Sequence, residues 1–397
     1  MKTSPTGRVA LLLFGSGLCA LVYQVAWLRE LRLVFGASTA ASAAVLGIFM
    51  GGLGAGGLVF GKRAAAAARP LALYARLEAG IAIASALTPL FVVVARWLYA
   101  AVGGTPALGL GGGTVARLVL AAVVLGVPTL LMGGTLPAAA QAVTRAGDVG
   151  RRDLAILYGA NTLGAVAGAT LSTFVLLEAL GTRRMLLAAC VLNLVVAAIA
   201  VLLASRMADR AAEAADEAPA VADAPVAPAV SPRFTLAAAA LVGFVFLLME
   251  LVWYRMLAPL LGGSSYTFGL ILAVALAGIG GGGVAYALFG GRRAATLTGF
   301  ALTCALEAAA LAVPFALGDR LAVWSATLRP LGSVGFYGFV AGWTAITTIV
   351  VFPAAFVSGV QFPLLIALYG HGRADVGRQV GNAYAWNTAG AIAGSLA

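Results

Sequence analysis

Charged residues are scarce in this sequence. Only 10% of its 397 residues are Asp, Glu, Lys or Arg, and 62% are hydrophobic, whereas roughly a quarter of an average soluble domain is charged. The mean hydropathy is accordingly high, at +1.02. A chain with so few charges cannot cover a folded core with a water-soluble surface, so much of its surface has to face lipid. The composition therefore excludes an ordinary soluble globular protein.

Cysteine and histidine are nearly absent, with 3 Cys and 1 His. Cys19, Cys190 and Cys304 lie far apart inside apolar stretches and lack the spacing of metal ligands, which indicates packing roles. A nucleotide-binding glycine loop is also missing, because the run GIGGGG at 278–283 lies within an apolar stretch rather than between a strand and a helix. We therefore expect no catalytic residues, no metal and no cofactor in this chain.

Acidic residues are outnumbered by basic ones, 14 to 25, and the net charge is +11. Such a balance can indicate nucleic-acid binding, but here the basic residues fall between apolar runs instead of on one face. Lipid head groups and membrane topology explain that placement better. We expect the lipid bilayer as the partner and no nucleic acid.

Apolar runs of about 20 residues or more, long enough to span a bilayer, recur along the chain. They are predicted at 8–34, 38–61, 71–102, 114–144, 154–180, 184–205, 234–261, 264–290, 295–317, 334–369 and 379–397. Between the two groups, residues 206–232 are acidic and rich in Ala and Pro, which indicates a linker. The predicted fold class is an all-α polytopic membrane protein, with a first transmembrane repeat of six helices at 1–205, a cytoplasmic linker at 206–232 and a second repeat of about five helices at 233–397.

The distribution of Lys and Arg predicts the orientation. If the N-terminus is cytoplasmic, the cytoplasmic segments carry nearly twice as many Lys and Arg residues as the external ones. Cytoplasmic segments of membrane proteins are enriched in these residues. We therefore predict a multi-pass protein of the bacterial cytoplasmic (inner) membrane with its N-terminus in the cytoplasm.

Matching residues at a constant offset of 226 (243 minus 17) reveal an internal repeat. The matches include Gly17 with Gly243, Trp27 with Trp253, Arg29 with Arg255, Tyr158 with Tyr384, Asn161 with Asn387, Thr162 with Thr388, Gly164 with Gly390 and Gly168 with Gly394. Six helices, an even number, precede the linker, so both copies enter the membrane in the same direction, like the halves of a major-facilitator transporter. Ala397 corresponds to Leu171, so the second repeat is predicted to be truncated.

Four segments carry a resemblance to a known family. They are ALVYQVAWLRELRLVFGAS at 20–38, LLMELVWYRMLAPLLGGSS at 247–265, GANTLGAVAG at 159–168 and AWNTAGAIAG at 385–394. Together they resemble the membrane domain of the bacterial fused major-facilitator/spermidine-synthase-like proteins. The resemblance implies a cytosolic aminopropyltransferase-like domain, with a decarboxylated S-adenosylmethionine-like cosubstrate and a polyamine-like acceptor. This chain lacks that soluble domain, so any such enzyme activity would need a part that is missing here.

Carboxylates inside the apolar runs are the first candidates for a site. Four lie there: Glu30, Glu78, Glu250 and Glu307. A charge at the centre of a membrane helix costs roughly 2.5–3.5 kcal/mol, so each of these carboxylates needs a partner. Trp253 and Tyr254 follow Glu250 by three and four residues and share its helix face. An acid beside aromatic rings suits an organic cation, with Glu78 and Glu307 as secondary charges.

The same acids could instead form permanent ion pairs. Arg29 or Arg255 could hold Glu250 or Glu78 inside the bundle, and this alternative stays open. Only the second copy has an acid at this position, because Gln24 occupies it in the first. A single acid favours one off-axis ligand site over an ion pair repeated by symmetry.

Asn161 and Asn387 complete the candidate residues. Each lies near the start of an apolar run, where an amide can form a hydrogen bond between helices or contact a substrate. Both alternatives stay open.

Three functions fit these observations. The first is a membrane module that anchors, or serves substrate to, an aminopropyltransferase-like domain. The second is a transporter of a small metabolite, with a cation as one option, and the third is a structural subunit of a larger membrane assembly. The first would have a cytosolic domain as a partner and the third other membrane subunits. Fold analogy alone does not choose among them.

Overall fold

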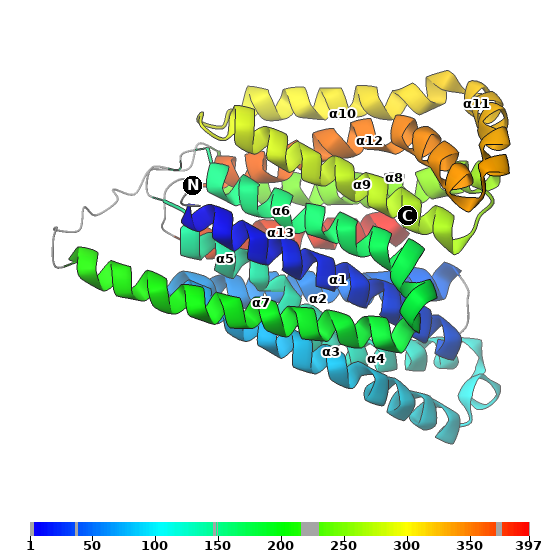
Figure 1. Ribbon diagram of the computed structural model, residues 1–397, viewed down its shortest axis with the longest axis horizontal. Coiled ribbons are helices and arrows are strands. Elements are labelled where there is room, and N and C mark those ends of the chain that lie inside the picture. Colours follow the sequence, from blue (N-terminus) through cyan, green and yellow to red (C-terminus); the bar gives the residue numbers. More distant parts are fainter. Residues whose placement is uncertain are drawn as a thin grey trace.

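Long helices running side by side make up the described chain (Figure 1). The computed structural model describes residues 4–35, 39–145, 148, 150–215, 230–370 and 375–396. Within these ranges, eight stretches are long and apolar enough to cross a membrane. The all-α polytopic fold class is therefore confirmed.

The first repeat contains a sharp reversal that separates two helices. Its helices are α1 (Pro5–Phe35), α2 (Thr39–Ala66), α3 (Pro70–Ala101), α4 (Gly104–Gly133), α5 (Thr135–Val143), α6 (Arg152–Leu171), the π-helical turn η1 (Ser172–Leu176) and α7 (Leu177–Ala215). The apolar stretch Arg152–Met207 has 56 residues, far more than the ~20 that one crossing needs. Gly181 divides it, because its φ of 69° and ψ of 169° are not helical. The chain turns back there, and α7 runs antiparallel to α6 (Figure 1).

The second repeat follows the first in helix order and direction (Figure 1). Its helices are α8 (Pro232–Leu261), α9 (Ser265–Ala285), the π-helical turn η2 (Tyr286–Gly290), α10 (Leu297–Leu317), α11 (Arg320–Leu328), the 3-10 turn η3 (Arg329–Val334), α12 (Phe336–Tyr369) and α13 (Val376–Leu396). The last described helix, α13, corresponds to α6. The short helix α11 was not predicted, because nine residues are too few for a spanning run.

The predicted linker lies mostly outside the described residues. Helix α7 continues to Ala215 and α8 begins at Pro232, and residues 216–229 are not described. The division at 206–232 therefore stays a prediction.

Glycines allow close contact between helices at equivalent positions in the two repeats. A Cβ atom on Gly164 of α6 would overlap the carbonyl oxygen of Phe14 of α1. The equivalent Cβ on Gly390 of α13 would overlap the carbonyl oxygen of Ala240 of α8. Both partners are shifted by 226 residues (390 minus 164, 240 minus 14), so the repeat in the sequence is also a repeat of backbone contacts.

The two repeats meet along two helix pairs, α2 with α13 and α6 with α9. Gly381 of α13 packs on the backbone of Gly57 of α2, and Gly283 of α9 lies against Gly159 of α6. Close packing of these pairs holds the bundles together at two edges. Helices α1 and α8 lie between those edges.

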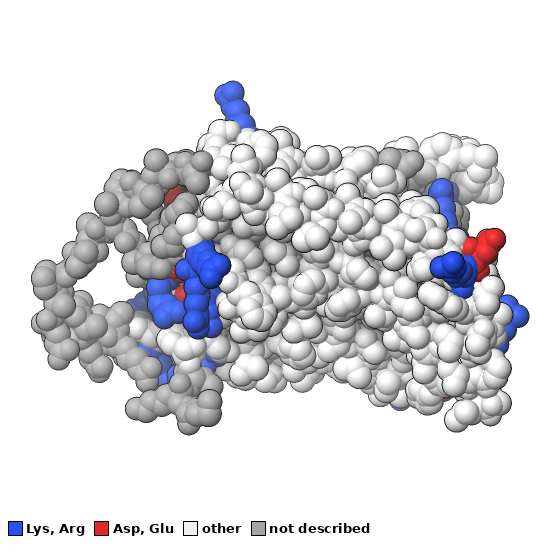
Figure 2. Space-filling model, turned by 90° about the horizontal axis from the view of Figure 1, so that it is seen from above, with Lys and Arg blue, Asp and Glu red and all other residues white. Residues whose placement is uncertain are grey.

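On one face of the molecule, charged side chains are confined to the ends of the bundle (Figure 2). On the face shown in Figure 2, Lys and Arg gather near both ends and a broad band between them is uncharged. Large apolar side chains such as Leu110, Val123 and Phe315 are exposed on the described helices. These side chains face lipid, so the protein is a multi-pass membrane protein. We call the end where α1 and α8 begin the N-side, and the opposite end the far side.

Candidate functional site

A cavity of about 250 Å³ lies between the two repeats. Helices α1, α2, α4, α5 and α6 line it from the first repeat, and α8, α9, α12 and α13 line it from the second. Several lining residues are repeat equivalents: Gln24 with Glu250, Tyr158 with Tyr384, and Asn161 with Asn387. The cavity is therefore a shared site at the repeat interface, which is where transporters built from repeats place theirs.

Glu250 of α8 is the one acid among the described residues that line the cavity. The described part of the chain has two ion pairs, Arg145–Asp153 and Arg378–Asp375, and neither includes it. Arg29 and Arg255, considered as its permanent partners, are both exposed. Glu250 therefore has no permanent ion-pair partner among the described residues. Its role in ligand binding stays a prediction.

Aromatic rings line the same cavity as Glu250, but not those that the sequence pattern indicated. Phe246 and Phe268 line the cavity. Trp253 is 1% exposed and packs edge-on against Phe246, with ring centroids 6.0 Å apart. Tyr254 packs edge-on against Phe268 at 5.8 Å. The two predicted rings thus support the rings that line the cavity.

The two asparagines lie in equivalent places. Asn161 and Asn387 both line the cavity. The Asn387 side-chain amide donates a hydrogen bond of 3.0 Å to the carbonyl oxygen of Ala239 on α8. That bond matches the interhelical role, and the position in the cavity wall leaves substrate contact as a prediction.

Glu78 and Glu307 lie outside the cavity, each beside an amide side chain. Glu78 is fully buried on α3, and the Asn193 amide nitrogen of α7 lies 2.9 Å from its carboxyl. Glu307 is 8% exposed on α10, and the Gln361 amide of α12 donates to it at 2.8 Å. The structure therefore separates both acids from Glu250.

An aromatic cluster from both repeats lies at the N-side of the cavity. Tyr158 of α6 stacks on Phe362 of α12, with centroids 4.9 Å apart. Tyr384 of α13 meets the same ring edge-on at 6.2 Å. All three rings line the cavity, so they form its N-side floor.

Hydrogen bonds join the repeats beneath this floor. Arg151, fully buried at the start of α6, donates to the carbonyl oxygen of Gly370 at 3.1 Å and to Oε1 of Gln379. Gln141 accepts from the Gly377 N–H at 2.8 Å. Burial lowers the pKa of Arg151 to about 10, so its guanidinium remains charged at neutral pH. We call these contacts the N-side lock.

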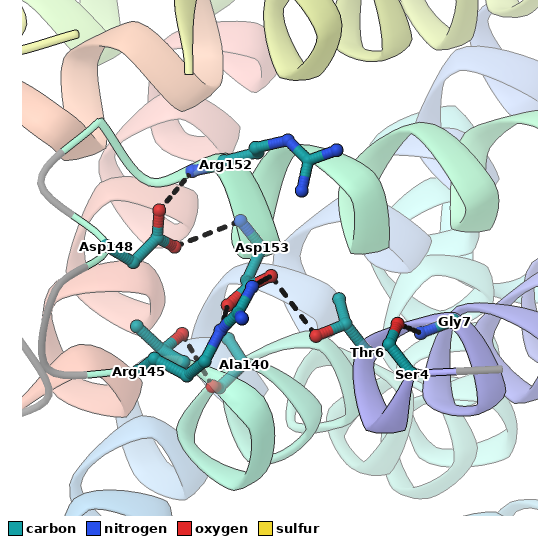
Figure 3. Close-up of polar contacts among 9 residues, drawn as sticks. Ser4, Thr6, Gly7, Ala140, Arg145, Asp148, Arg152 and Asp153 are labelled. Carbon is teal, nitrogen blue, oxygen red and sulfur yellow. Dashed lines mark hydrogen bonds and ion pairs between the residues drawn. The ribbon is translucent and has the colours of Figure 1, made fainter. Parts of the chain in front are cut away.

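A second network fixes the lock to the first repeat (Figure 3). The Asp148 carboxylate accepts hydrogen bonds from the backbone N–H groups of Arg152 at 2.7 Å and Asp153 at 2.9 Å, which caps α6. Arg145 forms an ion pair with Asp153, which also accepts a bond from the Thr6 hydroxyl. Burial raises the pKa of the Asp148 carboxyl. The network therefore ties α1, α5 and α6 together at the N-side.

Sequence reasoning missed the lock, although a signal was present. The letters DVGR occur at 148–151 and again at 375–378. Their offset is 227 (375 minus 148), one more than the 226 that holds in the helices. A search at a single offset therefore misses the pair.

Solved structures with the same fold are transporters of the major facilitator type. A bacterial homologue of the iron transporter ferroportin in its outward-facing state is 13% identical and gives a TM-score of 0.56, over 98% of this chain and 91% of that one. The major facilitator superfamily proton:xylose symporter XylE is also 13% identical, with a TM-score of 0.51, over 98% and 87%. At these identities the likeness shows the fold alone. No family model and no curated protein matches this chain.

The resemblance to fused spermidine-synthase-like proteins was wrong. The structural neighbours are major-facilitator transporters, and nothing among them indicates a synthase-like family. The predicted role as a membrane module for an aminopropyltransferase-like domain depended on this resemblance and is therefore unsupported. The segments that carried the resemblance contain Gly164, Gly168, Gly390 and Gly394, whose Cβ positions lie against the backbone of α1 or α8. Close packing of any two membrane helices selects such glycines, so they do not identify one family.

Proposed function

We propose that this protein is a transporter of a small organic cation. The proposal rests on Glu250, an acid that forms no ion pair within the described residues and lies in a cavity between two parallel repeats. A carboxylate in a membrane interior requires a compensating charge. A substrate that brings the positive charge supplies it transiently.

The rings around Glu250 support an organic cation over a hydrated metal ion. Phe246 and Phe268 line the cavity with predominantly apolar neighbours. A cation near an aromatic face gains roughly 0.5–2 kcal/mol, depending on its desolvation. An alkylated ammonium group matches both the apolar wall and the carboxylate.

Transport proceeds by movement of one repeat relative to the other around the cavity. We take the aromatic floor and the N-side lock as the closure of one end of the cavity, because their contacts join the two repeats. Release of the lock opens that end while the helix pairs α2–α13 and α6–α9 guide the motion. We place the N-side in the cytoplasm of a bacterial inner membrane, because the larger share of Lys and Arg lies there.

The replacement Glu250→Gln tests the proposal in reconstituted vesicles. Tetraethylammonium is the probe, and its saturable binding and uptake are measured. We expect the wild-type protein to bind and transport it, and Glu250→Gln to weaken binding about tenfold, which corresponds to about 1.4 kcal/mol. The physical reason is loss of the only acid among the described cavity residues.

A swap between the repeats provides the control. Glu250→Gln combined with Gln24→Glu moves the carboxyl to the equivalent position on α1, which also lines the cavity. We expect the swap to restore binding to within about threefold of wild type. Binding that is unchanged in Glu250→Gln, or wild-type protein that neither binds nor transports any organic cation in a panel, contradicts the proposed function.

A further inference from the structure

A second buried carboxyl lies outside the cavity, between α1, α3 and α7. Glu78 of α3 is fully buried, as are Tyr74 one turn earlier and Asn193 of α7. Ser16 of α1 lies beside the carboxyl and also lines the cavity. Glu78 is therefore one side chain removed from the cavity wall.

The orientation of the Asn193 amide is fixed by its neighbours. Its nitrogen lies 2.7 Å from the backbone carbonyl oxygen of Glu78 and 2.9 Å from Oε2 of the same residue. A carbonyl oxygen can only accept, so the NH₂ group and not the amide oxygen must face it. The same NH₂ group therefore faces the carboxyl, which disfavours a metal cation at that position.

The remaining polar atoms around Glu78 are incompletely satisfied. Oε1 of Glu78 and the hydroxyl of Tyr74 form no hydrogen bond of good geometry among the described residues, although the hydroxyls of Tyr74 and Ser16 lie beside the carboxyl. An ionised carboxylate that faces only neutral amide and hydroxyl groups in an apolar interior costs several kcal/mol, whereas a neutral carboxylic acid costs far less. A proton on Glu78 removes that charge, and the neighbouring hydroxyl oxygen of Tyr74 can accept a hydrogen bond from it.

None of the described groups that face Glu78 is a basic side chain that forms an ion pair with it. Tyr74 faces it from its own helix, and Cys19 and Tyr23 from α1. On α7, Asn193 faces Glu78, and Cys190 lies beside Tyr23. Helices α2, α4 and α5 contribute apolar core side chains, among them Phe49, Phe60, Leu125, Met132, Leu136 and Ala139, and the buried polar side chains Thr129 and Thr135 of α4 and α5 are uncharged. Arg76 of α3 is exposed, and neither ion pair in the described ranges includes Glu78.

We propose that Glu78 is an exchangeable proton-binding site that couples transport to a proton gradient. The proton reaches it from the cavity past Ser16 when α1 moves, and the carboxyl gives the proton back when the cavity opens to the other side. No bond other than the carboxyl O–H forms or breaks. Coupling to transport rests on the proposed function, whereas binding of the proton does not.

Glu307 offers a matched control in the second repeat. It also occupies the third spanning helix of its repeat and accepts from one amide, that of Gln361, at 2.8 Å. Gln361 is not among the residues that line the cavity. A substitution there removes a comparable carboxyl that has no cavity-lining contact in these hydrogen bonds.

Infrared difference spectroscopy of the reconstituted full chain measures the proton directly. After a pH jump, we expect the protonated-carboxyl spectrum of wild-type protein and of Glu307→Gln to contain a component that is missing in Glu78→Gln, while any components from Glu250 and Glu307 remain. If Glu78→Gln does not purify as a monodisperse protein, Asn193→Leu reports on the same carboxyl. Its band is expected to shift in frequency, because the amide neighbour is lost. Identical carboxyl spectra of wild-type protein and Glu78→Gln, or of wild-type protein and Asn193→Leu, overturn the proposal.

Transport measurements test the coupling and separate it from the proposed function. In vesicles with a proton gradient, Glu78→Gln is expected to lower tetraethylammonium accumulation at least fivefold, while exchange without a gradient stays within twofold. Full gradient-driven accumulation in Glu78→Gln overturns the coupling. A wild-type protein that shows the Glu78 band but moves no organic cation contradicts the proposed function and leaves the proton site supported.

Discussion

Gly164→Ala is expected to prevent purification of a stable, monodisperse protein. The new Cβ would overlap the carbonyl oxygen of Phe14, so α1 and α6 would have to move apart along their whole contact. Overpacking in a close-packed interior costs typically 1–3 kcal/mol, and more where the obstacle is backbone that cannot rotate away. Gel filtration in detergent and the midpoint of thermal unfolding measure the effect.

Gly126→Ala of α4 is the matched control. No atom lies within 4 Å of a Cβ placed on Gly126, so the same substitution there meets open space. We expect an unchanged elution profile and a slightly higher unfolding midpoint, because alanine favours a helix by about 1 kcal/mol over glycine. Gly390→Ala should reproduce the Gly164 result in the second repeat. Equal behaviour of Gly164→Ala and Gly126→Ala would show that the α1–α6 contact is not as close as described.

Arg151→Met is expected to open the N-side in a large fraction of molecules. The substitution removes the hydrogen bonds to the Gly370 carbonyl oxygen and to Gln379. Bonds from a charged donor contribute about 1.5–3 kcal/mol each, and the desolvation that lowers the pKa of Arg151 to about 10 offsets part of that sum. A net loss of about 2 kcal/mol shifts the ratio of open to closed molecules about thirtyfold.

Spin labels at Arg69 and Arg292 measure this opening. Both side chains are exposed on the N-side, one in each repeat. We expect a longer inter-label distance to become prominent in Arg151→Met. Arg145→Met is the control, because Arg145 pairs with Asp153 inside the first repeat and is 71% exposed. An unchanged distance distribution in Arg151→Met, or an equal change in Arg145→Met, would remove the lock from the mechanism.

Much of the candidate cavity was predictable from one comparison within the sequence. Aligning the repeats paired Gln24 with Glu250 and Asn161 with Asn387, and all four line the cavity. Equivalent positions in parallel repeats face the same internal axis, so matched polar residues tend to meet there. The aromatic wall was not predictable in the same way. Helix spacing placed Trp253 and Tyr254 on the face of Glu250, but only packing decides which ring reaches the cavity.

The sequence by itself determined the solvent, the repeat and the direction of the second copy. Hydrophobic composition dictates a lipid environment, and a constant offset with an even number of helices dictates parallel repeats. Composition is a total over all residues and the repeat is a periodicity along the chain, so neither depends on where a single side chain lies.

The tertiary structure decided which acid lies in the cavity and which residues close its N-side. Glu78, Glu250 and Glu307 look alike in sequence, yet only Glu250 lines the cavity. Arg151 and Gly370 lie 219 residues apart and form a hydrogen bond because the helix pairs α2–α13 and α6–α9 bring the loops together. Contacts of that kind depend on the distances and angles between packed helices. Glycines at these contacts allow close approach, but the backbone geometry of both partners decides where each neighbouring side chain comes to lie.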